Sequence, residues 1–355
     1  MKTSDFDYLL PESAVAQEPA EPRDACRLAV LNRATGAVEH TVFSDLARHL
    51  SPGDCLVLND SKVLSCRVPC LKRSGGARVE ALLIKPLADR VGAWEALLKP
   101  ARRVKPGAFL DAVQSPVPGE GFEVLAKTEA GTAHLRWTGA RPLDPSVLER
   151  IGEPPLPPYI RRRGQEAGAR IALDRERYQT VYARQFGSAA APTAGMHFTL
   201  PLLERLRQSG VEIATVTLHV GMGTFLPVKE DDPARHLMHQ EDYHVSPQAS
   251  QAVQRARGRN KRVVAVGTTS MRVLESAAAG DGSLQTGFGS TRLFILPGYR
   301  FKVVDALITN FHVPRSTLLM LVSAFDQRER VLRLYRECLD LNYRFLSYGD
   351  AMLLI

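Results

Sequence analysis

The sequence has 355 residues, of which 45% are hydrophobic and 24% charged, and its formal net charge is +8. This length and composition provide enough apolar surface for a substantial core and suggest about two domains. They argue against a membrane-spanning protein, because no window approaches the roughly 18 consecutive apolar residues that a spanning helix requires. The acidic N-terminal stretch also lacks the apolar core of a signal peptide, so we expect a cytoplasmic protein.

The five cysteines are scattered along the chain. Cys66 and Cys70 stand four apart, but no second pair lies at a spacing typical of metal binding. We therefore expect the cysteines to be reduced and structural, as in most intracellular proteins.

The N-terminal part alternates short elements and ends in a polar turn. Apolar periodicity and capping residues predict a helix over residues 5–10, a strand over 27–31, a helix over 43–50 and a strand over 55–58. This last strand leads into the polar residues Asn59, Asp60, Ser61 and Lys62. Such a turn could bind a ligand at the strand end, or could be only an Asx-type turn.

Between residues 66 and 138, short β-like runs alternate with glycine-containing turns. The runs cover residues 66–71, 79–84, 94–98, 108–110, 122–125 and 132–137. Short strands at this spacing are typical of a small antiparallel barrel or sandwich. Because a strand precedes them and α/β units follow, we predict an inserted β-barrel domain over 66–149 and an α/β domain made of 1–65 and 150–355.

A proline-rich segment over residues 153–159 follows, which favours a stiff, extended linker. Directly after it stand Arg161, Arg162 and Arg163, and the next segment predicts a helix over 175–185. A second basic run comprises Arg255, Arg257, Arg259, Lys261 and Arg262. With the positive net charge, these runs indicate an anionic partner such as RNA or DNA, although a solvated surface would look the same.

The most informative unit spans residues 189–225. Thr199 is placed to cap a short helix, and the strand that follows alternates between Val216, Leu218 and Val220 on one face and polar residues on the other. A loop with Gly195 and His197 opens the unit. A loop from His219 to Thr224 closes it at the carboxyl end of the strand, where ligands bind in open α/β sheets. We expect His219 to face a cleft, and His197 to enter the same region.

Two later units repeat this strand–loop–helix arrangement, which is Rossmann-like. In the first, a strand over 262–266 turns through Thr268 and Thr269 into a helix over 271–279. That helix start suits a carboxylate or phosphate, although the same hydroxyls would also serve as ordinary caps. In the second, a strand over 303–309 is followed by a loop with Asn310 and His312, and then by an apolar helix capped by Ser316. A helix is expected over 331–345.

Several segments of the sequence together resemble one family. They are LNDSKV (58–63), LPPYIRR (156–162), RYQTVYA (177–183), APTAGMHFT (191–199), LHVGMGTF (218–225), VGTTSMRVLES (266–276), the long segment 297–325 and SYGDAMLL (347–354). This set is similar to the S-adenosylmethionine:tRNA ribosyltransferase-isomerases of queuosine biosynthesis. Methionines at 196, 222 and 271 stand where the family often has Leu or Val, and Arg292 stands where an acidic residue is common.

The resemblance implies an α/β domain carrying an inserted small β-barrel, and a cytoplasmic enzyme that modifies a base in the tRNA anticodon. S-adenosylmethionine would donate its ribosyl group to 7-aminomethyl-7-deazaguanine, giving epoxyqueuosine-tRNA and releasing adenine and methionine. Such chemistry requires a base near the sulfonium, donors to a developing oxyanion and exclusion of water.

The resemblance and the strand-end positions together give the candidate site residues. The candidate bases are His197, His219 and His312, because a neutral imidazole can accept a proton. Contacts to S-adenosylmethionine or the base are expected from Asn59, Asp60, Gly195, Gly221, Gly223, Thr224, Thr268, Thr269, Arg272, Asn310, Tyr348 and Asp350. Contacts to tRNA are expected from Arg161, Arg162 and Arg163. We expect no metal and no cofactor beyond S-adenosylmethionine, which is consumed as a substrate, and we expect a monomer.

Two other classes of function remain open at this point. The chain could be a non-catalytic RNA-binding barrel protein, in which case the histidine-bearing loops would have no purpose. It could also be a metal-dependent hydrolase that uses His236, His239 and Glu241, although their spacing matches no common zinc motif.

Overall fold

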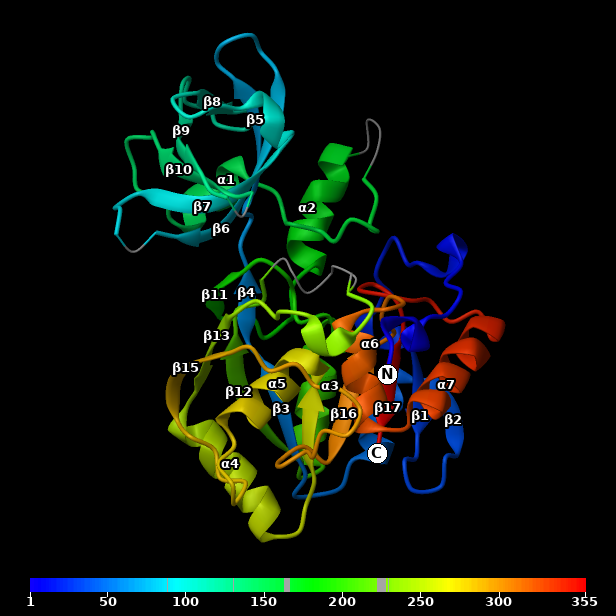
Figure 1. The fold of residues 1–355 in the computed structure, drawn as a ribbon. Helices are drawn as coiled ribbons and strands as arrows, with labels where there is room; N and C mark the ends of the chain where they lie inside the picture. The colour runs from blue at the N-terminus through cyan, green and yellow to red at the C-terminus, as the bar shows by residue number, and fades with distance from the viewer. Residues whose placement is uncertain (88, 130, 163–166, 222–227, 229) are drawn as a thin grey trace.

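A computed structural model describes residues 1–87, 89–129, 131–162, 167–221, 228 and 230–355. Figure 1 shows a closed barrel set apart from a larger α/β body, with β4 (Ser61–Val63) and β11 (Gln185–Ser188) between them. The α/β domain with an inserted antiparallel barrel that the sequence predicts is confirmed.

The α/β body is built on one nine-stranded mixed sheet. In spatial order its strands are β15 (Gly287–Thr291), β13 (Glu241–Val245), β12 (Glu212–Leu218), β3 (Cys55–Asn59), β14 (Val263–Val266), β16 (Ala306–Asn310), β17 (Ala351–Leu354), β1 (Arg27–Leu31) and β2 (Val38–Val42). The central strands β12, β3, β14 and β16 run parallel to one another. Their carboxyl ends therefore meet at one edge, where open α/β sheets bind ligands.

Helices cover both faces of this sheet, so its central strands are apolar on both sides. One core layer contains residues of α4 (Pro247–Gly258), α5 (Gly267–Ala277), α6 (Thr317–Phe325) and α7 (Arg328–Asp340), and the other contains residues of α3 (Leu200–Gln208). Along β3, Cys55 and Val57 belong to the first layer, and Leu56 and Leu58 to the second.

The inserted domain is a closed antiparallel barrel in the order β10-β7-β6-β5-β8-β9. Its strands are β5 (Arg67–Lys72), β6 (Arg78–Pro86), β7 (Ala93–Lys99), β8 (Phe109–Ala112), β9 (Gly121–Lys127) and β10 (Ala133–Trp137). α1 (Pro145–Ile151) packs Val147, Leu148 and Ile151 into the barrel core. α2 (Ala167–Arg177) lies beside the connection between the two domains (Figure 1).

Short 3-10 helices complete the described elements. They are η1 (Thr3–Phe6), η2 (Glu12–Ala14), η3 (Arg23–Ala25), η4 (Phe43–His49), η5 (Ala101–Arg103), η6 (Thr193–His197) and η8 (Pro233–Arg235).

Several local predictions are confirmed. The Thr199 hydroxyl accepts a hydrogen bond from the Leu202 amide and caps α3, and Ser316 caps α6 through the Leu319 amide, both at 3.2 Å. Val216 and Leu218 of β12 face the same core layer, as the alternating pattern predicts. The five cysteines are free and buried.

Other local predictions are wrong because distant contacts override the local pattern. The helix expected over residues 175–185 ends at Arg177, since the amides of Arg184 and Gln185 both donate to the carbonyl oxygen of Asp60. The helix expected over 5–10 is only η1, because the chain extends so that the Tyr8 hydroxyl reaches the His312 carbonyl oxygen at 2.5 Å. α7 lies three to five residues earlier than expected.

Within the described part of the chain, no helix combines the length and the apolar character needed to cross a membrane.

Candidate functional site

A cleft separates the barrel from the carboxyl ends of the central strands. We call it the interdomain cleft; it holds about 1140 Å³ of empty space, open solvent included. The barrel contributes Trp94, and the α/β body contributes Gly187, His219 and Asp242. The cleft therefore lies at the sheet edge that the parallel topology predicts for a ligand.

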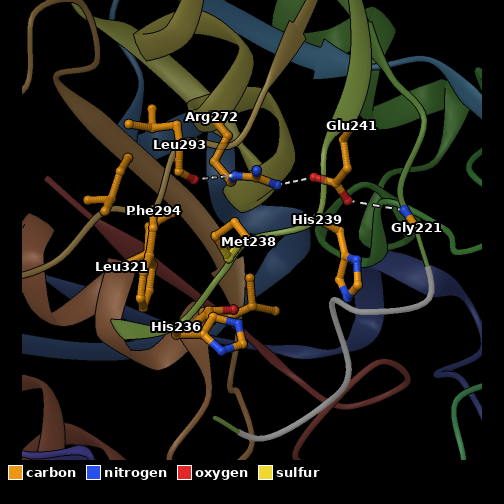
Figure 2. Close-up of a pocket in the computed structure, with 12 residues that line it drawn as sticks. Gly221, His236, Met238, His239, Glu241, Arg272, Leu293, Phe294 and Leu321 are labelled. Carbon is orange, nitrogen blue, oxygen red and sulfur yellow. Dashed lines mark hydrogen bonds and ion pairs between the residues drawn. The ribbon is translucent and has the colours of Figure 1, made fainter. Parts of the chain in front are cut away.

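A second cavity adjoins this cleft. We call it the Arg272 pocket; it has about 510 Å³ of empty space, open solvent included, and lies between α5, the start of β13, segment 293–295 and α6. Gly221 and Glu241 line both cavities. Figure 2 shows Arg272, Glu241 and Gly221 connected by hydrogen bonds along one side of the pocket. A ligand could thus occupy both cavities by passing Gly221.

His219 lies half-buried between β11 and β13 and faces the interdomain cleft, as its position in the strand predicts. Its backbone amide donates to the Asp242 carbonyl oxygen at 3.1 Å, and its Nδ1 is buried without a hydrogen-bond partner among the described residues. The ring lies against Gly187, where a Cβ would come within 2.9 Å of two ring atoms. Glycine at 187 is therefore required for the imidazole to occupy this position.

The electrostatic surroundings keep His219 neutral near pH 7. Burial lowers the pKa of His219, and the nearby carboxylates of Asp242 and Asp60 oppose that shift. Burial raises the pKa of Asp60, whose Oδ1 accepts a hydrogen bond from the Thr217 hydroxyl at 2.7 Å. A neutral imidazole in the wall of a cleft can act as a general base.

Asn59 and Asp60 occupy the polar turn singled out in the sequence. The Asn59 amide group pairs with β12, accepting from the Leu218 amide at 3.0 Å and donating to the Leu218 carbonyl oxygen at 3.2 Å. Its side chain is thus engaged in joining two strands, whereas the neighbouring Asp60 carboxyl lies close enough to His219 to influence its titration.

Arg272 is held by two partners in the wall of its pocket. Its Nη1 pairs with Glu241, and its Nε donates to the Leu293 carbonyl oxygen at 3.0 Å. Glu241 also accepts from the Gly221 amide at 3.1 Å. The ion pair is almost fully enclosed, so it fixes the guanidinium rather than leaving it mobile.

His197 does not face the cleft, and that expectation is wrong. Its ring packs against Phe43 with centroids 5.2 Å apart, its Nδ1 lies 3.1 Å from Cys26 Sγ, and its Nε2 lies 3.0 Å from Asn310 Nδ2. Burial, with smaller contributions from nearby arginines, lowers the pKa of His197 to about 3. The ring is enclosed because η6 directs it into the core layer beneath α3 rather than toward the barrel.

His312 is enclosed in a similar way. Its Nε2 lies 2.9 Å from the Thr309 hydroxyl, its backbone amide donates to the Tyr335 hydroxyl at 3.1 Å, and burial lowers its pKa to about 3. Of the three histidines at loop positions, the structure brings His219 alone to a described cavity wall, while a catalytic role for any of them stays a prediction.

The remaining predicted contact residues fall into three groups. Gly221 and Arg272 line the cavities described above. Buried within the fold are Gly195, Thr268, Thr269, Asn310, Tyr348 and Asp350. Gly223, Thr224 and Arg163 lie outside the described residues.

Hydrogen bonds explain the burial of two of these side chains. Asp350 accepts from the backbone amides of Arg27 at 2.9 Å and Arg344 at 2.7 Å, and the Tyr348 hydroxyl donates to Asp174 at 3.0 Å. At Gly195, any Cβ would collide with the Tyr182 hydroxyl. Asp350, Tyr348 and Gly195 thus have a role in the fold itself. Contacts of these residues to a ligand stay predictions.

The arginine run divides into two environments. Arg161 is exposed and pairs with Glu12 at 3.1 Å. The Arg162 guanidinium forms a two-pronged pair with Asp174, both contacts at 2.7 Å, and its side chain is only 8% exposed. Arg161 is therefore available to a phosphate, whereas Arg162 is committed to the interior.

The cluster considered for a metal does not assemble. His236 Nδ1 lies 3.1 Å from Glu230, and Glu241 faces Arg272 and Gly221. Across residues 1–162, 167–221 and 230–355, apart from 88 and 130, no group of three or more His, Cys, Asp or Glu side chains is arranged to hold a metal ion.

Sequence reasoning missed residues whose importance depends on long-range contacts. Gly187 was not singled out, although it alone permits the His219 ring position. The pairing of Glu241 with Arg272 was also missed, because 31 residues separate the partners and the neighbouring histidines suggested a metal. Trp94 lines the cleft from the barrel, and nothing in its local sequence indicates that role.

Comparison with known proteins agrees with this geometry. Residues 3–354 match the family described as Queuosine biosynthesis protein. A relative from Symbiobacterium thermophilum, named S-adenosylmethionine:tRNA ribosyltransferase-isomerase, is 50% identical over 363 residues, covering 100% of both chains. One from Anaeromyxobacter sp. with the same name is 51% identical, covering 100% of this chain and 99% of its own. The crystal structure of S-adenosylmethionine tRNA ribosyltransferase from Thermotoga maritima is 37% identical, with a TM-score of 0.55, covering 99% of this chain and 100% of that one.

Proposed function

We propose, from the premise that this chain belongs to the queuosine biosynthesis protein family and is a transferase, that it acts on tRNA with S-adenosylmethionine. It transfers and isomerises the ribosyl group of S-adenosylmethionine onto 7-aminomethyl-7-deazaguanine in the anticodon. The products are epoxyqueuosine-tRNA, adenine and methionine. No metal or redox cofactor takes part in this proposal, since the sulfonium itself activates the donor.

The observation that carries this proposal, beyond family membership, is the position of His219. A positive sulfonium acidifies its adjacent C–H bond, and the first step needs a neutral base to remove that proton and form the ylide. His219 has a lowered pKa and a place in the cleft wall, which support it in this role. The ylide electrons form a carbon–carbon double bond as the ribose ring opens and adenine leaves with a proton, which gives an aldehyde and a vinyl sulfonium. The aminomethyl nitrogen then adds to the vinyl sulfonium, loses a proton and regenerates the ylide. Attack of this ylide on the aldehyde closes the carbocycle, and the resulting alkoxide expels methionine as the epoxide forms.

The cleft also has features suited to a nucleic-acid base. Trp94 and Phe186 line it from the barrel and from β11, and the Lys62 ammonium lies 4.4 Å from the centre of the Phe186 ring. Aromatic faces next to positive charge favour stacked bases and phosphates in single-stranded RNA. These residues therefore support entry of the anticodon base between the two domains.

Mass spectrometry tests the proposal directly. tRNA carrying the aminomethyl-deazaguanine base is incubated with the protein and S-adenosylmethionine, and the nucleosides and small molecules are quantified. We expect adenine and methionine to appear in equal amounts with the modified nucleoside, and no S-adenosylhomocysteine. Formation of S-adenosylhomocysteine in proportion to modified tRNA would show methyl transfer instead and would refute the proposal.

A further inference from the structure

The Arg272 pocket has an apolar wall and one strongly polar side. The wall is formed by Met238, Leu293, Phe294, Ile295, Leu318 and Leu321. On the polar side, Arg272 and Glu241 form the ion pair drawn in Figure 2. Such a cavity suits a ligand with an aliphatic chain and a charged end group.

Arg272 has an unsatisfied hydrogen-bond donor in this setting. Its side chain is 6% exposed, its Nη1 is taken by Glu241 and its Nε by the Leu293 carbonyl oxygen. Its Nη2 is buried and finds no partner among the residues that the structure describes. Buried donors on a charged group are costly to leave unpaired, so this nitrogen indicates an acceptor supplied by a ligand.

The surrounding contacts fix the direction of the guanidinium. Glu241 is itself anchored by the Gly221 amide, and Leu293 also lines the pocket. Arginine presents donors in a planar fork that matches a carboxylate with two oxygens. This guanidinium is held through two of its nitrogens while the third stays unpaired, so its orientation is fixed for an anionic oxygen pair.

The pocket is also placed correctly relative to His219. Gly221, which follows His219 by two residues, lines both the pocket and the interdomain cleft. A ligand with its carboxylate at Arg272 would run past Gly221 toward the histidine. S-adenosylmethionine has this form, with an amino-acid end, a short aliphatic chain and then the sulfonium.

We propose that Arg272 recognises the α-carboxylate of S-adenosylmethionine, and that the apolar wall receives the methylene groups of its methionine part. This assignment rests on the proposed function and specifies which end of the substrate lies in which cavity. Glu241 is a positioning residue, since it holds the guanidinium.

Decarboxylated S-adenosylmethionine, which lacks only the carboxylate, provides the test. Binding of both compounds is measured by calorimetry with the wild-type chain and with Arg272→Gln. Because a hydrogen bond to a charged group is worth roughly ten- to a hundredfold in affinity, the wild type should prefer S-adenosylmethionine by about that factor. Arg272→Gln should bind S-adenosylmethionine as weakly as the decarboxylated compound, with affinity for the latter little changed.

A matched control separates this effect from a general change of charge. Arg292 is exposed and next to Leu293 but does not line the pocket, so Arg292→Gln should keep the wild-type preference. If Arg272→Gln does not fold, the wild-type comparison alone decides, because equal affinity for the two compounds overturns the proposal. Competition by inorganic phosphate as strong as competition by methionine would overturn it in favour of a phosphate site.

The outcome is distinguishable from failure of the proposed function. Wild-type protein that modifies tRNA yet binds both compounds equally would refute only the carboxylate assignment. Wild-type protein that does not modify tRNA would refute the function, whatever its binding preference.

Discussion

The ends of β12 and β16 look alike in sequence and differ in the folded protein. Each strand runs into a loop with a histidine, His219 after β12 and His312 after β16. In the sheet they are separated by β3 and β14. His219 is half-buried in the wall of the interdomain cleft, whereas His312 is 8% exposed and lies within the hydrogen-bonded core.

The difference comes from what covers each strand end. Beyond β12 stands the barrel, and the glycine at 187 leaves room for an imidazole. Beyond β16, aromatic side chains from both chain termini close over the loop: Tyr8 and Phe345 each pack against Tyr335, with ring centroids 5.2 and 5.7 Å apart. A strand end is thus a place where a site can form, but distant segments decide whether it stays open.

The strongest test of this contrast is the activity of His219→Ala. Because removal of a general base typically costs 10²–10⁴-fold, we expect turnover of tRNA to fall by about that factor. The melting temperature should stay near the wild-type value, since the half-buried ring fills part of a cleft rather than the core. Both quantities are measured by single-turnover nucleoside analysis and thermal unfolding.

His312→Asn serves as the matched control for this experiment. Loss of the His312 ring should lower the free energy of unfolding and largely retain turnover per folded molecule. The reason is that the enclosed ring contacts Thr309 and lies away from the described cavities. Full activity in His219→Ala, or selective loss of activity in folded His312→Asn, would reverse the interpretation of the two strand ends.

The pH dependence of stability provides a second, smaller contrast. His197 and His312 have pKa values lowered to about 3, whereas an unfolded histidine titrates near 6.5. Below 6.5 the unfolded chain therefore binds protons that the folded chain excludes, and stability present above pH 6.5 is lost as the pH falls toward 3. Each histidine should contribute a slope of up to about 1.4 kcal/mol per pH unit.

Urea unfolding between pH 7 and 5 measures this slope before most carboxylates titrate. His219 shifts in the same direction, so it adds to the effect in the wild type. His312→Asn should reduce the slope by up to about 1.4 kcal/mol per unit, the contribution of one proton. A free energy of unfolding that stays constant from pH 7 to 5 would contradict the enclosed, neutral state of these rings.

These contrasts also indicate how much of the structure can be predicted from the sequence alone. Local signals were sufficient for the Thr199 and Ser316 caps, for the alternation along β12 and for the barrel strands, because each depends on neighbouring residues. They failed for the segment after Arg177 and for His197, where partners more than 100 residues away determine the conformation. The Arg272–Glu241 pair belongs to the same class, since only the folded sheet brings its two segments together.

The arginine run repeats the contrast between open and enclosed positions at adjacent residues, and Arg161 gives the smallest expected effect. Arg161 is exposed, so Arg161→Ala should remove about one phosphate contact. Since each contact releases counterions, the slope of log affinity for tRNA against log salt should become shallower by about 0.7–0.9. The melting temperature should stay near wild type, because exposed ion pairs contribute little to stability.

Arg162→Ala should show the opposite pattern. Loss of one partner of an enclosed pair costs about 3–5 kcal/mol of stability, because Asp174 is left without its guanidinium. The salt slope of the folded fraction should stay unchanged. A shallower slope in Arg162→Ala with an unchanged slope in Arg161→Ala would show that the tRNA backbone approaches from the other side of this segment.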